Sequence, residues 1–456
     1  MQPVTTDDVK PERLSWRESI TLYGKPRVLA LLFLGFSAGL PFLLVFSTLT
    51  AWLTESGVTR TTIGFFSSIG ITYSIKVFWA PVVDKLKLPV LHRIFGQRRS
   101  WMLLGQLGIA VGLVLMALTD PAADVRLMAV FGLLVAFSSA TQDISIDAYR
   151  IEAAEDKYQA AMSAAYVFGY RLALLVAGAG VLYLAEYLGW RSAYLIMAAL
   201  MGVGVMTVIL VKKPENLRPA AAPVVDIDRQ AGLSQRLAAW FTDAVVGPFV
   251  DFFKRNGWYA LLILLFIAVY RISDITMGVM ANPFYLDIGF SKTEIADVTK
   301  VFGFFMTIAG SALGGVLVAR YGIRPILLIG GCMVAATNLL FAWLAVSEPT
   351  LVKLALVISA DNLSGGLAIV AFIAYLSSLT SSAYTATQYA LFSSLMTLPG
   401  KFIGGFSGVV VDAAGYPSFF TYAAVLGIPA ILLVCLLIYL DKQGKTPFSK
   451  NRATTQ

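Results

Sequence analysis

The 456-residue sequence has little of the chemistry on which most enzymes rely. It contains one histidine, His92, and two cysteines, Cys332 and Cys435, which both fall inside apolar stretches. A disulfide framework and a cysteine or histidine metal site are therefore not expected. No phosphate-binding loop, nucleophile elbow or channel filter repeat is apparent either. An enzyme or a channel is a poor explanation of such a chain.

Charge is also scarce, and apolar residues take its place. Charged residues make up 14% of the chain and hydrophobic residues 58%, with a mean hydropathy of +0.75, whereas soluble domains carry roughly 25% charge. A helix needs about 20 mostly apolar residues to cross a bilayer. Twelve stretches meet this need: 28–52, 61–83, 101–119, 126–149, 160–186, 191–211, 258–284, 293–319, 325–347, 351–378, 385–411 and 418–440. The sequence predicts an all-α integral membrane protein.

An internal repeat divides the spans into two halves. Shifting residues 148–198 by 226 positions superposes, without a gap, Ala148-Tyr149 on Ala374-Tyr375 and Gly189 on Gly415. A shift of 232 places residues 57–64 on 289–296. Two six-span halves in the same orientation resemble the plan of major facilitator transporters, in which the substrate site lies near the midplane. The expected segments are 1–27, the half 28–211, the linker 212–257, the half 258–441 and the tail 442–456.

The distribution of lysine and arginine predicts the orientation. Each loop on one side of the membrane holds one such residue or none, the residues being Arg60, Arg126, Arg191, Lys292 and Lys353, and the loops on the side of the termini are basic. The positive-inside rule therefore places both termini in the cytoplasm. Basic loops that face an anionic leaflet explain the pI of about 9.3 without a nucleic-acid partner.

The linker between the halves has an apolar periodicity of its own. Leu233, Leu237, Phe241, Val245, Phe249 and Phe252 recur at helical spacing. This pattern favours a helix that lies on the inner membrane surface with its apolar face down, and a simple linker is the alternative.

Ionisable residues interrupt the apolar spans. They are Lys76, Asp143, Arg171, Arg271, Asp274, Lys300, Asp361 and Lys401, with Asp147 and Asp297 nearer the span ends. A charge at the bilayer centre costs at least about 2.5 to 3.5 kcal/mol on insertion scales. Any single one has the alternative of a structural ion pair or a snorkelling side chain, but so large a set predicts a polar interior. The roles of Lys300, Asp361 and Lys401 stay open.

The loop after the second span resembles the major facilitator loop signature. Asp84, Lys85, Gly96, Arg98 and Arg99 supply it, with a longer spacing than the standard form, and in the second half Gly315, Arg320, Gly322 and Arg324 stand in the equivalent place, where Ala319 replaces the acidic residue. A carboxylate at a helix end that faces an arginine of a neighbouring helix can act as a latch between rocking halves. Asp84, Lys85, Arg98, Arg99, Arg320 and Arg324 are predicted gate residues.

Two longer blocks are more specific. "YSIKVFWAPVVDK" (73–85) and "TQDISIDAYR" (141–150) resemble the AmpG-type muropeptide permeases and, more distantly, the acetyl-coenzyme A transporters. The resemblance implies proton-driven import of GlcNAc-anhydroMurNAc, with or without a stem peptide, across a bacterial inner membrane. The expected partners are muropeptide, protons and membrane lipid, and we expect a monomer without a cofactor. A carrier for acyl-coenzyme A, peptides or sugars is the alternative.

Helical geometry assigns roles to the second block. Asp143, Asp147 and Arg150 share one helical face, with Asp147 in reach of Arg150, and this pair is predicted to belong to the gate. Lys76 precedes Asp84 by eight residues and Asp143 precedes Arg150 by seven, so at about 1.5 Å per residue both lie at the same depth, about 10 to 12 Å inside the cytoplasmic end. A Lys76–Asp143 pair is then either a fixed staple or the site of proton coupling.

An anionic, sugar-containing substrate needs cations and aromatic faces. Arg171 and Arg271 are predicted near the midplane, one from each half, and a guanidinium grips carboxylates in a bidentate way. Local neutralisation of Arg271 by Asp274 is the alternative to such a clamp. Further substrate-binding candidates are Gln142, Tyr73, Tyr149, Tyr170 and Asn282, beside Tyr166 and Tyr270, and packing is the alternative for each tyrosine.

Overall fold

The computed structural model describes residues 15–58, 62, 66–153, 155–211, 242–381 and 383–443. Within these ranges the regular structure is helical, with no strand, so the predicted all-α fold is confirmed. Much of the expected linker helix, including Leu233, Leu237 and Phe241, lies outside the described residues, as does most of the predicted tail. The side chain of Lys300 is also outside them.

The first half contains the helices up to residue 210. They are α1 (Trp16–Thr21), η1 (Leu22–Gly24), α2 (Pro26–Leu44), α3 (Ser47–Glu55), η2 (Ser67–Gly70), α5 (Ile71–Ser74), η3 (Lys76–Phe78), α6 (Ala80–Lys85), α7 (Leu91–Leu118), α8 (Val125–Glu152), α9 (Asp156–Leu175), η4 (Val176–Gly180), α10 (Val181–Leu200) and α11 (Gly202–Leu210).

The linker and the second half contain the remaining helices. They are η5 (Thr242–Val246), α13 (Gly247–Asn256), α14 (Tyr259–Val269), α15 (Ile272–Asp287), α16 (Lys292–Ile295), η6 (Ala296–Phe302), α17 (Gly303–Tyr321), α18 (Ile323–Val346), α19 (Leu351–Leu379), α20 (Thr385–Leu395), α21 (Leu398–Gly404), α22 (Ser407–Val425) and α23 (Ile428–Lys442).

The described residues contain 9 helices long and apolar enough to cross a membrane, and breaks and fusions reconcile this number with the twelve predicted spans. Spans five and six run together as Lys157–Leu210, and span twelve is fused to the end of span eleven in Ser407–Lys442. Span two is broken into η2, α5, η3 and α6, and span eleven into α20, α21 and the start of α22. Pro399 at the start of α21 contributes to the second break, because proline lacks the N–H that would continue a helix.

Glycines with positive φ reproduce the internal repeat in the backbone. Gly96 and Gly322 are related by the shift of 226, as are Gly189 and Gly415, and Gly57 and Gly289 by the shift of 232. Their φ angles lie between 76° and 102°, a region that side chains disfavour. Gly189 and Gly415 each mark the sharp turn between two fused spans. The six-residue difference between the shifts therefore falls between residues 64 and 96, where the loop before α7 is longer in the first half.

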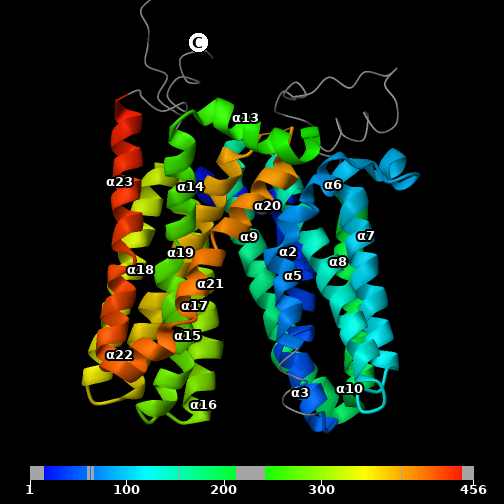
Figure 1. Cartoon of the computed structure of the whole chain (residues 1–456), viewed down its shortest axis with the longest axis horizontal. Helices are drawn as coiled ribbons and strands as arrows, with labels where there is room; N and C mark the ends of the chain where they lie inside the picture. Colours follow the sequence, from blue (N-terminus) through cyan, green and yellow to red (C-terminus); the bar gives the residue numbers. More distant parts are fainter. Residues whose placement is uncertain are drawn as a thin grey trace, which may run out of the picture.

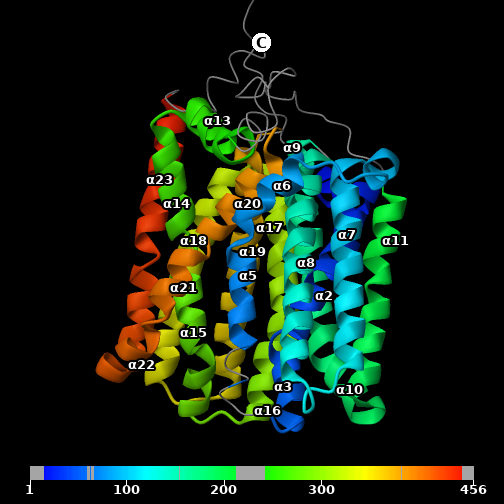
Figure 2. The same ribbon diagram turned by 45° about the vertical axis from the view of Figure 1, so that its right-hand side comes forward.

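The two halves converge on one face of the molecule (Figure 1). We call this the terminal face. It carries α6, α13 and the end of α23. Toward the far face, which carries α3 and α16, the halves diverge. Contacts between the halves join α9 to α17 and α19, and α20 to α6, η3 and α8. The turned view shows α13 across the terminal face of the second half (Figure 2).

Small residues allow close helix packing within the first half. A Cβ atom on Gly169 of α9 would lie 1.8 Å from the carbonyl oxygen of Leu32 in α2, and one on Gly35 would lie 2.2 Å from that of Tyr166. Such close backbone approach is typical of membrane helices, where lipid removes the hydrophobic drive and packing must hold helices together. This contact fixes α9, and thus Arg171, against α2.

Candidate functional site

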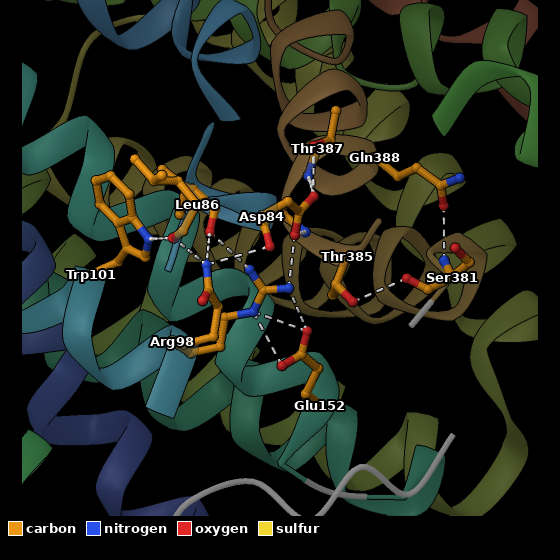
Figure 3. Close-up of polar contacts among 12 residues, drawn as sticks. Asp84, Leu86, Arg98, Trp101, Glu152, Ser381, Thr385, Thr387 and Gln388 are labelled. Atoms are coloured by element: carbon orange, nitrogen blue, oxygen red, sulfur yellow. Dashed lines mark hydrogen bonds and ion pairs between the residues drawn. The ribbon is translucent and has the colours of Figure 1, made fainter. Parts of the chain in front are cut away.

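Asp84 is the centre of a polar network that joins the halves at the terminal face (Figure 3). Its carboxylate accepts hydrogen bonds from the backbone N–H groups of Ala386 at 3.0 Å and Thr387 at 2.6 Å, and from Oγ1 of Thr387 at 2.6 Å. Arg98 binds the same carboxylate at 2.7 Å and Glu152 at 2.7 Å. The side chain of Asp84 is 1% exposed. We call Asp84, Arg98 and Glu152 with the first turn of α20 the gate network.

The gate network depends on an incomplete helix end. The first N–H groups of a helix lack partners within it, and Tyr384, at the N-cap of α20, makes no side-chain cap hydrogen bond. Asp84 of the other half takes this role, helped by the positive end of the helix dipole. Gln97 and Trp101 hold the segment after α6 by donating to the carbonyl oxygen of Leu86 at 2.8 and 2.9 Å.

Arg150 makes a second connection between the halves. Its side chain is fully buried and donates to Ser163 at 2.9 Å and, across the interface, to Ser377 at 2.8 Å. It also lies 5.1 Å from the ring centre of Tyr389 and pairs with Asp147 at 3.2 Å. The predicted contact between Asp147 and Arg150 is therefore confirmed.

The linker helix α13 holds the same turn of α20 from another side. Gln388 accepts from Arg255 at 3.0 Å and donates to Asp251 and to the carbonyl oxygen of Pro248, both at 2.8 Å. Phe252 is buried, with its ring centre 5.2 Å from that of Phe392. The described end of the expected interfacial helix thus packs on protein with one of its apolar residues.

The other predicted gate residues lie apart from this network. Arg99 donates to the carbonyl oxygens of Val208 and Ile209 at the end of α11. Arg324, the repeat equivalent of Arg98, forms an ion pair with Asp441 inside the second half. Arg320 lies 5.7 Å from the ring centre of Tyr321. Lys85 does reach across the interface, 4.4 Å from the ring centre of Tyr384.

Several gate partners carry no motif in the sequence. Glu152 follows Arg150 by two residues and is the last residue of α8. The only sequence feature that pointed to it was its position as a third charged residue, after Asp147 and Arg150, at that helix end. The partners from the second half are backbone N–H groups, hydroxyls and an amide, namely those of Ala386, Thr387, Ser377 and Gln388. Neutral groups of this kind are common in any helix, and only the fold brings them to Asp84 and Arg150.

Asp143 lies deeper in α8, without the direct lysine partner that we expected. Among the described residues, its Oδ1 atom is buried and has no hydrogen-bond partner. Lys76 acts on it electrostatically, but no ion pair joins the two side chains in the described part of the chain. Span two is broken at η3, where Lys76 lies, so a depth calculated from a continuous helix does not apply. The hydroxyl groups of Tyr73, Tyr166 and Tyr170 lie in the field of Asp143.

Arg171 and Arg271, which belong to opposite halves, lie close enough to act on each other electrostatically. Arg171 feels the charges of Arg271 and Asp274, although it belongs to α9 and they belong to the start of α15. Its side chain is exposed in the structure, although it lies in the middle of a span. Arg271 forms an ion pair with Asp274, so the local neutralisation that stood as the alternative to the clamp is present. Arg271 and Asp274 also line a pocket with Ser273, Gly331 and Gly365.

Three substrate-binding candidates lie elsewhere. Gln142 is buried and exchanges hydrogen bonds with Ser37 at 2.8 and 3.1 Å, which ties α8 to α2. Tyr149 packs in the core with Leu22, in the fields of Arg99 and Arg27, because six helical residues turn it away from the face of Asp143. Asn282 is exposed toward the other end of α15.

The four remaining candidate tyrosines pack against other aromatic rings. Tyr270 donates to the carbonyl oxygen of Leu327 at 2.9 Å and stacks on Phe372 at 4.5 Å. The ring centre of Tyr73 lies 5.8 Å from that of Phe42, and the ring centre of Tyr170 lies 6.1 Å from that of Tyr166. Lys401, for which the sequence offered no role, donates to Ser74 at 3.0 Å and joins the broken spans eleven and two.

Comparisons with known proteins agree with this architecture. A family model described as Major Facilitator Superfamily matches residues 31–404 and again 272–456. The chain is 34% identical over 417 residues to the putative transporter AmpG 4 of Rickettsia conorii, which covers 91% of this chain and 96% of that protein. It is also 34% identical over 420 residues to the anhydromuropeptide permease of Escherichia coli K12, covering 91% of this chain and 81% of that one.

Solved structures share the fold at low sequence identity. The proton:xylose symporter XylE aligns with a TM-score of 0.62 at 14% identity, over 91% of this chain and 94% of that one. The Escherichia coli fucose:proton symporter FucP aligns with a TM-score of 0.66 at 11% identity, over 91% and 99%.

Proposed function

Since the chain belongs to the major facilitator superfamily and, within it, to the AmpG-type permeases, we propose that this transporter imports anhydromuropeptides from the periplasm to the cytoplasm by proton symport. The substrate class is GlcNAc-anhydroMurNAc with or without a stem peptide. The protein then lies in a bacterial inner membrane with its terminal face toward the cytoplasm, which agrees with the basic loops on that side.

The observation that carries the proposal is that Arg171 and Arg271 come from opposite halves and lie in each other's electrostatic field. Two cations from opposite halves form a site that an anionic solute can bridge, and each guanidinium can bind a carboxylate in a bidentate way. Arg171 is exposed, so a solute can reach it. A site shared by both halves also changes its geometry when the halves rock, as alternating access requires.

The gate network supplies the closed end of the cycle. With Asp84 on the first turn of α20 and Arg150 on Ser377, the terminal face is closed and the halves diverge toward the far face (Figure 1). Release into the cytoplasm requires α20 to leave Asp84. After this step Asp84 still has Arg98 and Arg150 still has Asp147, so no buried charge is left without a partner.

Asp143 is the proposed proton-coupling residue, with Lys76 as the cation that acts on it. Its unpartnered Oδ1 atom supports this role, because a buried carboxylate without donors gains from protonation. Asp143→Asn is expected to abolish accumulation driven by a proton gradient while ligand binding remains measurable.

Uptake into proteoliposomes tests the function. The protein is reconstituted, labelled GlcNAc-anhydroMurNAc is added outside, and uptake is followed with an inward proton gradient and after a protonophore has collapsed it. We expect accumulation only with the gradient. Equal uptake in both conditions contradicts proton symport. Uptake of labelled acetyl-coenzyme A in place of the muropeptide contradicts the substrate assignment.

A further inference from the structure

Asp361 in α19 is an interior carboxyl group for which the mechanism above has no use. Asp84, Asp147 and Asp274 each form an ion pair with an arginine, whereas no such pair reaches Asp361 in the described part of the chain. Its hydrogen bond from Oγ1 of Thr337 is long, at 3.5 Å. A half-buried carboxyl group with so little direct support is an unstable place for a fixed charge.

The groups that face Asp361 come from two neighbouring helices, α15 and α18. Asp274 of α15 acts on it electrostatically, and Asp361 in turn acts on Tyr285 of the same helix. Thr337 belongs to α18. On its own helix the next residue, Asn362, is turned to Thr307 of α17, with a hydrogen bond of 2.7 Å. The nearby charge is therefore that of Asp274, which Arg271 neutralises.

A polar seam connects this carboxyl group with the pocket of Arg271 and Asp274. Asn338 is fully buried and donates to Ser273 at 2.8 Å, while its Oδ1 atom and Oγ1 of Thr276 have no partner among the described residues. Ser273 lines the pocket, and Thr337 beside Asn338 reaches Asp361. Orphaned polar atoms in a buried seam are suited to water or an exchangeable proton.

Four charged side chains are linked electrostatically: Arg171 with Arg271 and Asp274, and Asp274 with Asp361. Arg171 and Arg271 are two cations, and Asp274 and Asp361 are two acids, so the set has no net charge when all four are ionised. In a site with little water, electroneutrality decides which charged states are stable. A substrate carboxylate that binds the two arginines brings one extra negative charge into this set.

We propose that Asp361 is a second proton-binding site, which takes up one proton when an anionic group of the substrate engages Arg171 and Arg271. The substrate competes with Asp274 for the guanidinium of Arg271. Asp274 then loses its compensating cation, and Asp361, which has no arginine of its own, accepts the proton. One negative charge and one proton enter together, so the site stays neutral. This inference rests on the proposed function and adds a coupling site in the second half to that of Asp143.

Proton counting during ligand binding tests the proposal. Detergent-solubilised protein is titrated with GlcNAc-anhydroMurNAc bearing a stem peptide, in weak buffer with a pH-sensitive dye, and binding is measured by calorimetry on the same samples. The number of protons that the protein takes up per bound ligand should be lower by about one in Asp361→Asn than in the unmodified protein. The affinity of this variant should also lose a pH dependence of up to about tenfold per pH unit, tighter binding at lower pH being the expected sign.

Two variants and one ligand serve as controls. Asp274→Asn should also take up one proton fewer per bound ligand. Without the charge of Asp274 the remaining three charged residues have a net positive charge, which the substrate carboxylate neutralises. Asp412→Asn, at an exposed carboxylate of the same half, should leave the proton count unchanged. A ligand with amidated carboxylates should bind without this proton.

The failure of the inference differs from the failure of the proposed function. Unchanged proton uptake and pH dependence in Asp361→Asn, with normal binding and transport, overturns the second site alone. Absence of muropeptide binding to the unmodified protein overturns the proposed function and the inference with it. Thermal unfolding of each variant without ligand checks that a lost proton does not reflect a misfolded sample.

Discussion

The two halves repeat one backbone but carry different charges. Gly96, Gly189 and their equivalents Gly322 and Gly415 adopt the same left-handed conformation. On span four, however, Asp143, Asp147 and Arg150 correspond by the same shift to Ile369, Ile373 and Leu376 of span ten. The repeat thus builds the scaffold, and the departures from it hold the chemistry.

Because of this difference, the two halves contribute different kinds of group to the closed interface. The first half contributes the buried charges, Asp84 and Arg150. The second half contributes the backbone N–H groups and hydroxyls that bind them. When the halves separate, water can satisfy these neutral groups, and the charges keep partners within their own half. A gate with one ion from each half would instead leave two unpaired charges at every opening, which is costly in a buried site.

The largest expected effect comes from Asp84→Ala. The substitution leaves Arg98 with one of its two carboxylates and uncaps α20, and loss of one partner of a buried pair costs about 3 to 5 kcal/mol. The terminal face should open. In a background without Cys332 and Cys435, a cysteine at Ser393 of α20, which is buried, should react about 100-fold faster with an impermeant maleimide added on that face.

The matched control for this gate variant is Asp124→Ala, which removes the N-cap of α8 on the other side of the membrane. It should leave the labelling rate unchanged. Equal rates in Asp84→Ala and the unmodified protein would remove Asp84 from the gate.

Arg150→Leu gives the first half the residue that the second half has at the equivalent position. Asp147 then loses its ion pair and Ser377 its donor, and we expect destabilisation of about 3 kcal/mol together with loss of uptake. The double variant Arg150→Leu/Asp147→Ile copies the second half at both positions. It should recover most of the thermal stability but not the uptake. Recovery of both would show that these charges are only structural.

Arg171→Ala should weaken ligand binding more than Arg271→Ala, because Asp274 already competes for Arg271. A hydrogen bond to a charged group contributes about 1.5 to 3 kcal/mol, so the Kd for a ligand with a stem peptide should rise roughly 10-fold to 100-fold. Peptide-free GlcNAc-anhydroMurNAc should lose less affinity. Calorimetric titration of both ligands decides the matter, and equal losses for the two would argue against a clamp on peptide carboxylates.

The sequence predicts the fold and the identity of the interior charges well, because hydropathy and the cost of buried charge act on each residue separately. It gives Arg171 and Arg271 a similar depth for the same reason, since both lie on spans whose depth can be counted, and the clamp between them stays a prediction. The direct Lys76–Asp143 pair fails because span two is broken at η3. Sequence reasoning missed Thr387 and Gln388 because a free helix end and an amide acquire their meaning only when α20 meets Asp84 and α13.

The smallest expected effect tests the shared backbone itself. Gly189→Ala and Gly415→Ala place a side chain at φ angles of 79° and 76° with ψ angles of 158° and 168°, a region essentially restricted to glycine, where another residue costs about 1 to 3 kcal/mol. A Cβ atom meets nothing within 4 Å at Gly189 and an ordinary contact of 3.8 Å at Gly415, so the two losses of thermal stability should be equal. Gly202→Ala, where φ is not positive and the space is equally open, should show no loss. A clear difference between Gly189→Ala and Gly415→Ala would mean that the two turns between fused spans contribute differently to stability. The two halves would then share their backbone conformation at these turns but not its contribution to the free energy of unfolding.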